Sequence, residues 1–129
     1  LCSPVGPVIG LIHIGWRGAR DGIIEEGLKS IPAPIYAFIG PAIAQRDYEV
    51  GKEFGKYFPQ EFLTPSSNGK LKFDLQGLVN YKLGSAGAKK IRRFPLTTYP
   101  NPFLPSYRRE GDNLAWQMEF YFSIYRKEN

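Results

Sequence analysis

The residues with the clearest chemical potential are the chain's single cysteine, Cys2, and its single histidine, His13. A thiolate and an imidazole are both good ligands for zinc or copper. If Gly6 and Pro7 form the turn of a tight hairpin, Cys2 lies opposite Leu11, and His13 follows two residues later on the same face. Diagonal neighbours on one face of a sheet lie about 7–8 Å apart, within reach of a shared ion. This register predicts a metal site at Cys2 and His13.

A catalytic zinc site normally has three protein ligands, and the chain contains no second cysteine or histidine. No acidic residue stands at a metal-ligand spacing from His13 that would complete the set. Two other interpretations therefore remain open. One is a buried thiol with a core histidine bonded to the backbone, and the other is a Cys–His nucleophile pair oriented by a third group.

Arg17 stands beside the point where a helix is expected to begin, near Gly18. A helix N-terminus carries unpaired N–H groups and a partial positive charge, and a guanidinium can bind an anion through two hydrogen bonds. The pattern favours binding of a phosphate or carboxylate. Stacking of Arg17 on Trp16, or an ion pair with Asp21, would account for the same residues equally well.

Tyr107, Arg108 and Arg109 form a further candidate binding group. In a strand the two arginines would point to opposite faces, so at most one of them joins a given pocket. An aromatic ring beside an arginine can hold a base and a phosphate, whereas a solvated hairpin end is the plainer interpretation. The chain contains no Walker-type loop, G-x-G-x-x-G or G-x-S-x-G motif.

The elements expected to position the first of these residues follow a strand–helix–strand order. Residues 8–14 form a continuous apolar run, which predicts a strand buried on both faces. Residues 18–31 place their apolar side chains on one face, which predicts a helix that ends at Pro32. Residues 35–39 predict a second buried strand.

Weaker signals follow along the chain. Residues 47–58 predict an amphipathic helix, and the composition of residues 64–69 is typical of a loop. Asp74 is the expected N-cap of a helix that continues to about residue 88. Residues 91–94 predict a short strand.

The last predicted element is a hairpin whose arms are residues 103–108 and 114–124, joined by a charged turn at residues 109–113. No composition shift marks a boundary, so residues 1–129 are expected to form one mixed α/β domain.

Composition limits the possible partners. No apolar run approaches the roughly 20 residues that span a bilayer, and no signal peptide is visible, so a membrane partner is not expected. One cysteine excludes an internal disulfide framework and fits a reducing cytoplasm. The net charge of +5 would suit an anionic ligand, but the basic residues are scattered, which favours a solvated basic surface and argues against nucleic acid.

The chain begins at Leu1, and its only methionine is Met118. We therefore expect it to be a processed or incomplete piece of a longer protein.

Several short motifs occur in a recognisable order: Cys2-Ser-Pro-Val, His13-Ile-Gly-Trp-Arg-Gly, Ile39-Gly-Pro-Ala-Ile43 followed by Tyr48-Glu-Val-Gly51, Lys72-Phe-Asp-Leu75, and Ser106-Tyr-Arg-Arg109. In this order they resemble the laccase-domain family, also called the purine nucleoside phosphorylase or multicopper polyphenol oxidase family. The resemblance spans nearly the whole chain. It corresponds to the C-terminal half, or somewhat more, of a typical member.

The resemblance implies an α+β fold in which mixed sheets are layered with helices, in an α/β/β/α-like arrangement of intertwined repeats, with only part of that fold present here. It also implies a metal, usually zinc with copper as the alternative, held by Cys2, His13 and a histidine from an N-terminal part that this chain lacks. The chain departs from the family pattern at three points. Leu1 replaces an acidic residue, and Thr97 or Thr98 stands where a cysteine is common. The separation of 11 positions between Cys2 and His13 is shorter than the family pattern implies, as if the connecting hairpin had been shortened.

The implied activity is metal-dependent phosphorolysis of purine nucleosides such as adenosine, inosine and methylthioadenosine, with adenosine deamination as a second reaction. The implied catalytic residues are Cys2, His13 and Arg17. Tyr107, Arg108 and Arg109 would join Arg17 in binding the nucleoside and phosphate.

Two alternatives remain, a copper-dependent polyphenol oxidase and a non-catalytic, truncated or degenerate family member. A multicopper cluster built from this chain is excluded by its single histidine. A cytoplasmic location is expected, and the oligomeric state stays open.

Overall fold

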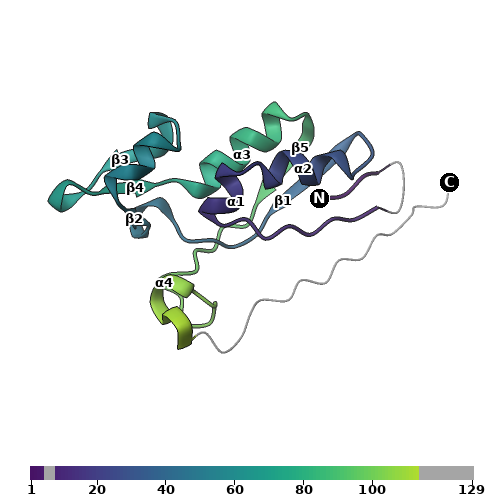
Figure 1. Ribbon diagram of the computed structural model, residues 1–129. Helices are drawn as coiled ribbons and strands as arrows, with labels where there is room; N and C mark the ends of the chain where they lie inside the picture. The colour runs from purple at the N-terminus through teal and green to yellow at the C-terminus, as the bar shows by residue number, and fades with distance from the viewer. Residues whose placement is uncertain (5–7, 114–129) are drawn as a thin grey trace.

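Two β-sheets organise residues 1–4 and 8–113, the part of the chain that the computed structural model describes (Figure 1). In one sheet, β1 (Ile35–Ile39) pairs in parallel with β5 (Ala88–Arg93). In the other, β4 (Leu71–Phe73) runs antiparallel to both β2 (Glu49–Val50) and β3 (Leu63–Pro65). The fold is therefore mixed α/β, as the sequence predicted.

The helices cover the two-stranded sheet and approach the smaller one. α3 (Leu75–Ser85) contacts β1 and β5, α2 (Ile23–Lys29) packs on α3, and α1 (Trp16–Arg20) packs on α2. α4 (Tyr107–Glu110) is a single turn set apart from these helices (Figure 1). Short 3₁₀ turns are η1 (Gln45–Asp47), η2 (Lys52–Lys56), η3 (Gln60–Phe62), η4 (Ser67–Gly69) and η5 (Gly111–Asn113).

β1, α3 and β5 confirm three predictions from local sequence. β1 has the bounds that its apolar run predicts, and Ile35, Ala37 and Ile39 are buried. The Asp74 carboxylate accepts the Gly77 N–H at 2.8 Å, so Asp74 is the N-cap of α3. α3 ends at Ser85, earlier than expected, and β5 begins at Ala88, before the predicted start.

The helix predicted over residues 18–31 is divided in two. Gly22 lies between α1 and α2 with φ of 88°, a left-handed conformation that glycine adopts at little cost and that ends the helical path of the chain. α2 then ends at Lys29, with Ser30 as its C-cap, before Pro32 is reached.

The helix predicted over residues 47–58 is wrong. Glu49 and Val50 pair with β4 as β2, and η2 follows. This pairing joins residues more than 20 positions apart, so no local pattern could reveal it. The predicted loop at residues 64–69 contains the end of β3 and the turn η4.

The buried strand predicted over residues 8–14 is also wrong. This segment forms only an isolated bridge at Ile9, and Leu11 is 71% exposed, because the segment lies outside Cys2 at the edge of the sheet. Residues 103–108 do not form the predicted hairpin arm but lead into α4, since Pro102 and Pro105 cannot donate to a strand ladder. The other predicted arm, residues 114–124, and the predicted turn residues Gly6 and Pro7 lie outside the described residues.

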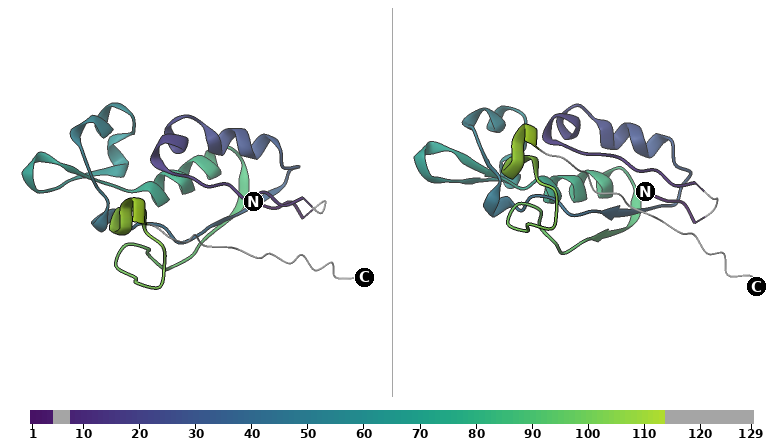
Figure 2. Two further views of the ribbon diagram at one scale, coloured as in Figure 1. Left: turned by 60° about the horizontal axis from the view of Figure 1, so that its bottom comes forward. Right: turned by 90° about the horizontal axis from the view of Figure 1, so that it is seen from below.

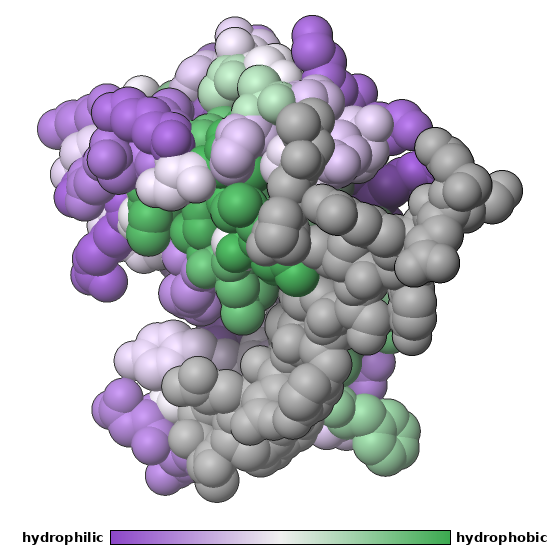
Figure 3. All heavy atoms as spheres, turned by 90° about the vertical axis from the view of Figure 1, so that its right-hand side faces the viewer, coloured by the Kyte–Doolittle hydropathy of each residue, from purple (hydrophilic) through white to green (hydrophobic). Residues whose placement is uncertain are grey.

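Apolar side chains form one continuous core, in which Phe73, Ile24 and Leu78 are almost completely buried. Some apolar side chains also reach the surface, and Figure 3 shows a hydrophobic region between polar ones on one side of the molecule. No helix within residues 1–4 and 8–113 is long and apolar enough to cross a membrane.

Lys82 ties α3 to both N-terminal helices. Its ammonium donates to the Ala19 carbonyl at 2.8 Å, at the end of α1, and to the Glu25 carboxylate at 2.9 Å. The hydrogen bond from Lys82 holds the pKa of Glu25 below its ordinary value of 4.5. Lys82 therefore contributes both a helix C-terminal contact and an ion pair.

We predict that Lys82→Met lowers the free energy of unfolding by about 1 kcal/mol at pH 7, because the Ala19 carbonyl and Glu25 lose their donor. Since the folded pKa of Glu25 is depressed, the ion pair stabilises the fold above pH 4.5 and loses this effect as the pH falls through the lowered pKa. Urea unfolding should therefore show a smaller difference between variant and wild type in acid.

The matched control is Lys29→Met. Lys29 pairs with Glu26 on the surface, where the two side chains are 71% and 74% exposed, so its loss should lower the free energy of unfolding less than the loss of Lys82 does. Equal losses in the two variants would contradict a linking role for Lys82.

Candidate functional site

A cleft of about 320 Å³ opens where α1, the small antiparallel sheet and α4 come together. This volume is at the lower end of the range for small-molecule sites, roughly 300–1,000 Å³. In Figure 1 α4 lies below the small sheet, and Figure 2, which turns this lower side toward the viewer, shows α4 projected near one end of that sheet. The lining residues are Trp16, Tyr48, Glu49, Val50, Gly51, Glu53, Phe54, Lys70 and Arg108.

Two aromatic side chains, Trp16 and Tyr48, form walls of the cleft and are held by a common cluster of rings. Trp16 packs on Phe54 with ring centroids 5.0 Å apart, and Tyr48 packs on Phe73 at 5.7 Å. Phe54 and Phe73 touch each other at 5.4 Å, so a continuous chain of ring contacts joins the two walls. Trp16 is therefore a packing residue of this aromatic cluster.

Each of these rings carries an arginine. The Cζ atom of Arg17 lies 4.6 Å from the ring centroid of Trp16, and that of Arg108 lies 5.3 Å from the ring of Tyr48. The stacking interpretation of Arg17 is therefore confirmed, whereas Asp21 pairs with Arg20 instead. A cation over an aromatic face is stabilised by the ring quadrupole and keeps N–H groups available to an anion.

The electrostatics around Tyr48 reflect both arginines. Burial of the phenol raises the pKa of Tyr48 above its ordinary value of 10, and the positive charges of Arg108 and Arg17 oppose this rise. Tyr48 is therefore a neutral phenol at physiological pH, able to donate a hydrogen bond into the cleft.

Two carboxylates, those of Glu49 and Glu53, also line the cleft. Glu49 accepts hydrogen bonds from Lys70 at 2.8 Å and Ser66 at 2.9 Å, and these bonds lower its pKa, Lys70 having the larger effect. The carboxylate of Glu53 folds back over Gly51, where an added Cβ would lie only 2.0 Å from its Oε2 atom. The absence of a side chain at Gly51 thus allows Glu53 its position in the cleft.

The structure separates the residues that the sequence grouped at positions 107–109. Arg108 lines the cleft, but it does so from α4 and not from the strand that the sequence predicted. The Tyr107 hydroxyl lies 3.3 Å from Asp112, and the Arg109 guanidinium binds backbone carbonyls of residues 98–104. The predicted roles of Tyr107 and Arg109 in substrate binding stay predictions.

The predicted register of Cys2 is wrong. Cys2 forms a bridge with Ile9, not Leu11, and Ser3 N–H donates to the Val8 carbonyl at 3.2 Å. A turn at Gly6 and Pro7 would have set Pro4 opposite Ile9, and Pro4 has no N–H to donate. On its other side Cys2 forms an antiparallel bridge with Tyr36 of β1, so the segment around Cys2 lies beside β1 and extends the two-stranded sheet.

His13 lies away from the cleft. It is exposed and lines a second, shallow hollow of about 420 Å³ with Leu11 and residues of α2, a hollow that Cys2 does not line. The residue opposite Cys2 is Ile9, which lies four positions before His13. The predicted partner, Leu11, lies only two positions before His13, so the structure sets His13 farther from the position opposite Cys2 than expected.

The described residues do not fit a zinc or copper site by themselves. Within residues 1–4 and 8–113, no group of three or more His, Cys, Asp and Glu side chains could hold a metal ion. The metal-binding roles of Cys2 and His13 stay predictions.

Sequence reasoning missed Tyr48, Glu53 and Lys70 as parts of the cleft. The only sequence signal for this region was the family motif Tyr48-Glu-Val-Gly51, which contains both Tyr48 and Gly51. Glu53 and Lys70 have ordinary surface composition, and only the pairing of β2 with β4 brings their segments together.

Comparison with known proteins identifies the relationships of this chain. The sequence model of the family described as multi-copper polyphenol oxidoreductase laccase matches residues 1–120. The chain belongs to this family. The fold agrees with that of a Neisseria meningitidis protein of the DUF152 family, whose crystal structure matches with a TM-score of 0.76 at 25% identity, over 88% of this chain and 50% of that one.

Curated relatives of this laccase-family chain are named purine nucleoside phosphorylase. One from Rickettsia conorii is 38% identical over 125 residues, covering 84% of this chain and 50% of the relative. One from Aquifex aeolicus is 39% identical over 106 residues, covering 79% of this chain and 50% of the relative. The chain therefore spans about half the length of the curated relatives it matches.

We predict that the purified 129-residue chain retains far less than one equivalent of zinc after gel filtration. Cys2 and His13 alone would leave a four-coordinate ion with too few protein ligands. Elemental analysis of the wild type, with His13→Ala as the comparison, measures this directly. Stoichiometric zinc that disappears in His13→Ala would contradict the prediction and establish His13 as a ligand.

Proposed function

We propose that the cleft between Trp16 and Tyr48 binds a purine nucleoside together with inorganic phosphate, and that the chain acts in purine nucleoside phosphorolysis. The observation that carries the proposal is the placement of Arg17 and Arg108 over the two aromatic walls. Aromatic faces suit a flat base, and guanidinium groups suit a phosphate dianion. The names of the curated relatives support the same reaction class.

Phosphorolysis makes defined demands on such a cleft. A phosphate oxygen forms a bond to C1′ of the ribose while the bond from C1′ to the purine nitrogen breaks, and the electron pair leaves with the base, which takes up a proton. Arg17 and Arg108 would hold the phosphate against C1′ and stabilise its charge as the bond forms. Both arginines are exposed residues, so they can reach a ligand.

The polar groups of the cleft have complementary tasks. The neutral Tyr48 phenol can donate a hydrogen bond to a phosphate oxygen. Glu53 presents a carboxylate at the same cleft, a suitable acceptor for ribose hydroxyl groups. Glu49 is already engaged with Lys70 and Ser66, so its task is to hold the β2–β4 edge of the cleft.

A cytoplasmic location is part of this proposal. The chain's single cysteine, Cys2, suits a reducing compartment.

We predict phosphate-dependent release of hypoxanthine from inosine by the chain, and a fall in kcat/KM of about 100-fold or more in Arg108→Ala, because one cationic donor is lost. Arg17→Ala should lower kcat/KM in the same direction. Base release is followed by chromatography at several phosphate concentrations.

The charge-matched control is Arg92→Ala, which removes an exposed arginine of β5 that does not line the cleft. It should leave the rate unchanged. Base release that ignores phosphate, or that survives both Arg17→Ala and Arg108→Ala, would contradict the proposal. Absence of any base release would instead support a non-catalytic family member.

A further inference from the structure

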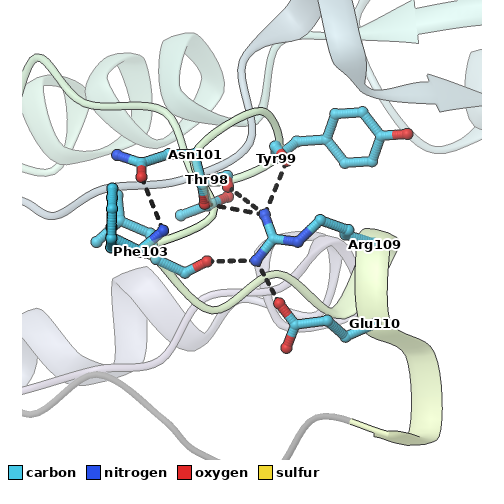
Figure 4. Close-up of polar contacts among 7 residues, drawn as sticks. Thr98, Tyr99, Asn101, Phe103, Arg109 and Glu110 are labelled. Carbon is cyan, nitrogen blue, oxygen red and sulfur yellow. Dashed lines mark hydrogen bonds and ion pairs between the residues drawn. The ribbon is translucent and has the colours of Figure 1, made fainter.

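The Arg109 guanidinium is the centre of a network of hydrogen bonds to the loop that precedes α4 (Figure 4). One terminal nitrogen, Nη1, donates to the carbonyls of Thr98 at 3.0 Å, Tyr99 at 2.8 Å and Asn101 at 3.0 Å. The other, Nη2, donates to the Leu104 carbonyl at 2.6 Å and to the Glu110 carboxylate. Five acceptors around one guanidinium leave it little capacity to bind a ligand.

The loop satisfies only part of its carbonyls by itself. The Asn101 N–H donates to the Thr98 carbonyl, and the Leu104 N–H donates to the Asn101 carbonyl. Pro100, Pro102 and Pro105 have no N–H, and no strand of the described chain pairs with residues 99–105. The loop begins at Thr98, whose N–H donates to the Ala42 carbonyl just beyond β1. Arg109 therefore connects α4 to a point that the main sheet anchors.

α4 depends on this connection for its position. A helix of four residues is not stable alone, and the N–H groups of Arg109 and Glu110 close its single turn on the Ser106 carbonyl. Successive residues of a helix point about 100° apart, so Arg109 and Arg108 face different surroundings. While Arg109 holds the loop, Arg108 is directed to Tyr48.

We propose that Arg109 is a positioning residue of the cleft: by binding the carbonyls of residues 98–104, it fixes α4 so that Arg108 stays over Tyr48. The part that Arg108 then plays toward phosphate rests on the proposed function, but the positioning itself does not. The two adjacent arginines therefore have separate tasks. Arg109 holds the loop, and Arg108 is directed to the ligand.

The test uses Tyr48 as a reporter, because the Arg108 charge lowers the pKa of its phenol and Arg17 is the other charged group that acts on it. The pKa of Tyr48 is measured by NMR of ¹³C-labelled tyrosine, with Tyr48→Phe to assign the signal. Arg108→Ala should raise this pKa, and Arg109→Ala should raise it by a similar amount. The double variant should show no further rise beyond Arg108→Ala, because Arg109 acts through Arg108.

Two further measurements separate positioning from simple stabilisation. Guanidinium chloride at low millimolar concentration should return the pKa of Tyr48 toward the wild-type value in Arg109→Ala, whereas urea at the same concentration should not. If Arg109→Ala does not fold, Arg109→Lys keeps the charge with fewer donors and should give an intermediate rise.

An unchanged Tyr48 pKa in a folded Arg109 variant would overturn the proposal. The readout needs no substrate, so it is independent of the proposed function. If the chain shows no phosphorolysis but the Tyr48 pKa rises as expected, the activity is rejected and the positioning role is kept. If phosphorolysis occurs but the Tyr48 pKa does not change, only the positioning role is rejected.

Discussion

The contacts of the Phe73 ring are the interaction on which the cleft depends. Phe73 has no exposed surface and stacks on Phe58 with ring centroids 4.5 Å apart, while touching Phe54 and Tyr48. Phe54 in turn holds Trp16. Because ring clusters of this kind combine large buried area with a preferred geometry, the spacing between the two walls of the cleft is set in the core and not at the surface.

The charges of the cleft are arranged on this aromatic base by three different parts of the chain. Arg17 of α1 lies over the Trp16 wall without lining the cleft itself, and Arg108 comes from α4. Glu49 comes from the edge strand β2, and Lys70 directly precedes the central strand β4. Arg108 alone depends on an irregular loop for its position. The cleft is therefore rigid on the side of the aromatic cluster and relies on one arginine network on the other.

Prediction from sequence succeeded where the deciding signal is local. The apolar run of β1, the Asp74 cap of α3 and the stacking of Arg17 beside Trp16 are all set by neighbours in the chain. The fold class and the family could likewise be inferred from motif order.

Prediction failed where distant segments decide the structure. β2 forms because Glu49 and Val50 find β4, and Arg108 reaches the cleft because Arg109 binds carbonyls up to 11 positions away. The predicted register of Cys2 was wrong because hydrogen bonds from Ser3 to Val8 and from Gly10 to Leu1 set Ile9 opposite Cys2. Each of these outcomes depends on hydrogen bonds between separate segments, which the spacing of apolar residues along the chain does not encode.

The central claim is that Arg17 and Arg108 together form the phosphate-binding part of this cleft. The most direct measurement is NMR of the arginine Nε–H groups during titration with inorganic phosphate. The signals of Arg17 and Arg108 should shift and saturate together, while those of Arg92 and Arg109 stay in place. Signals of Arg17 and Arg108 that do not move, or equal shifts at all arginines, would contradict the claim.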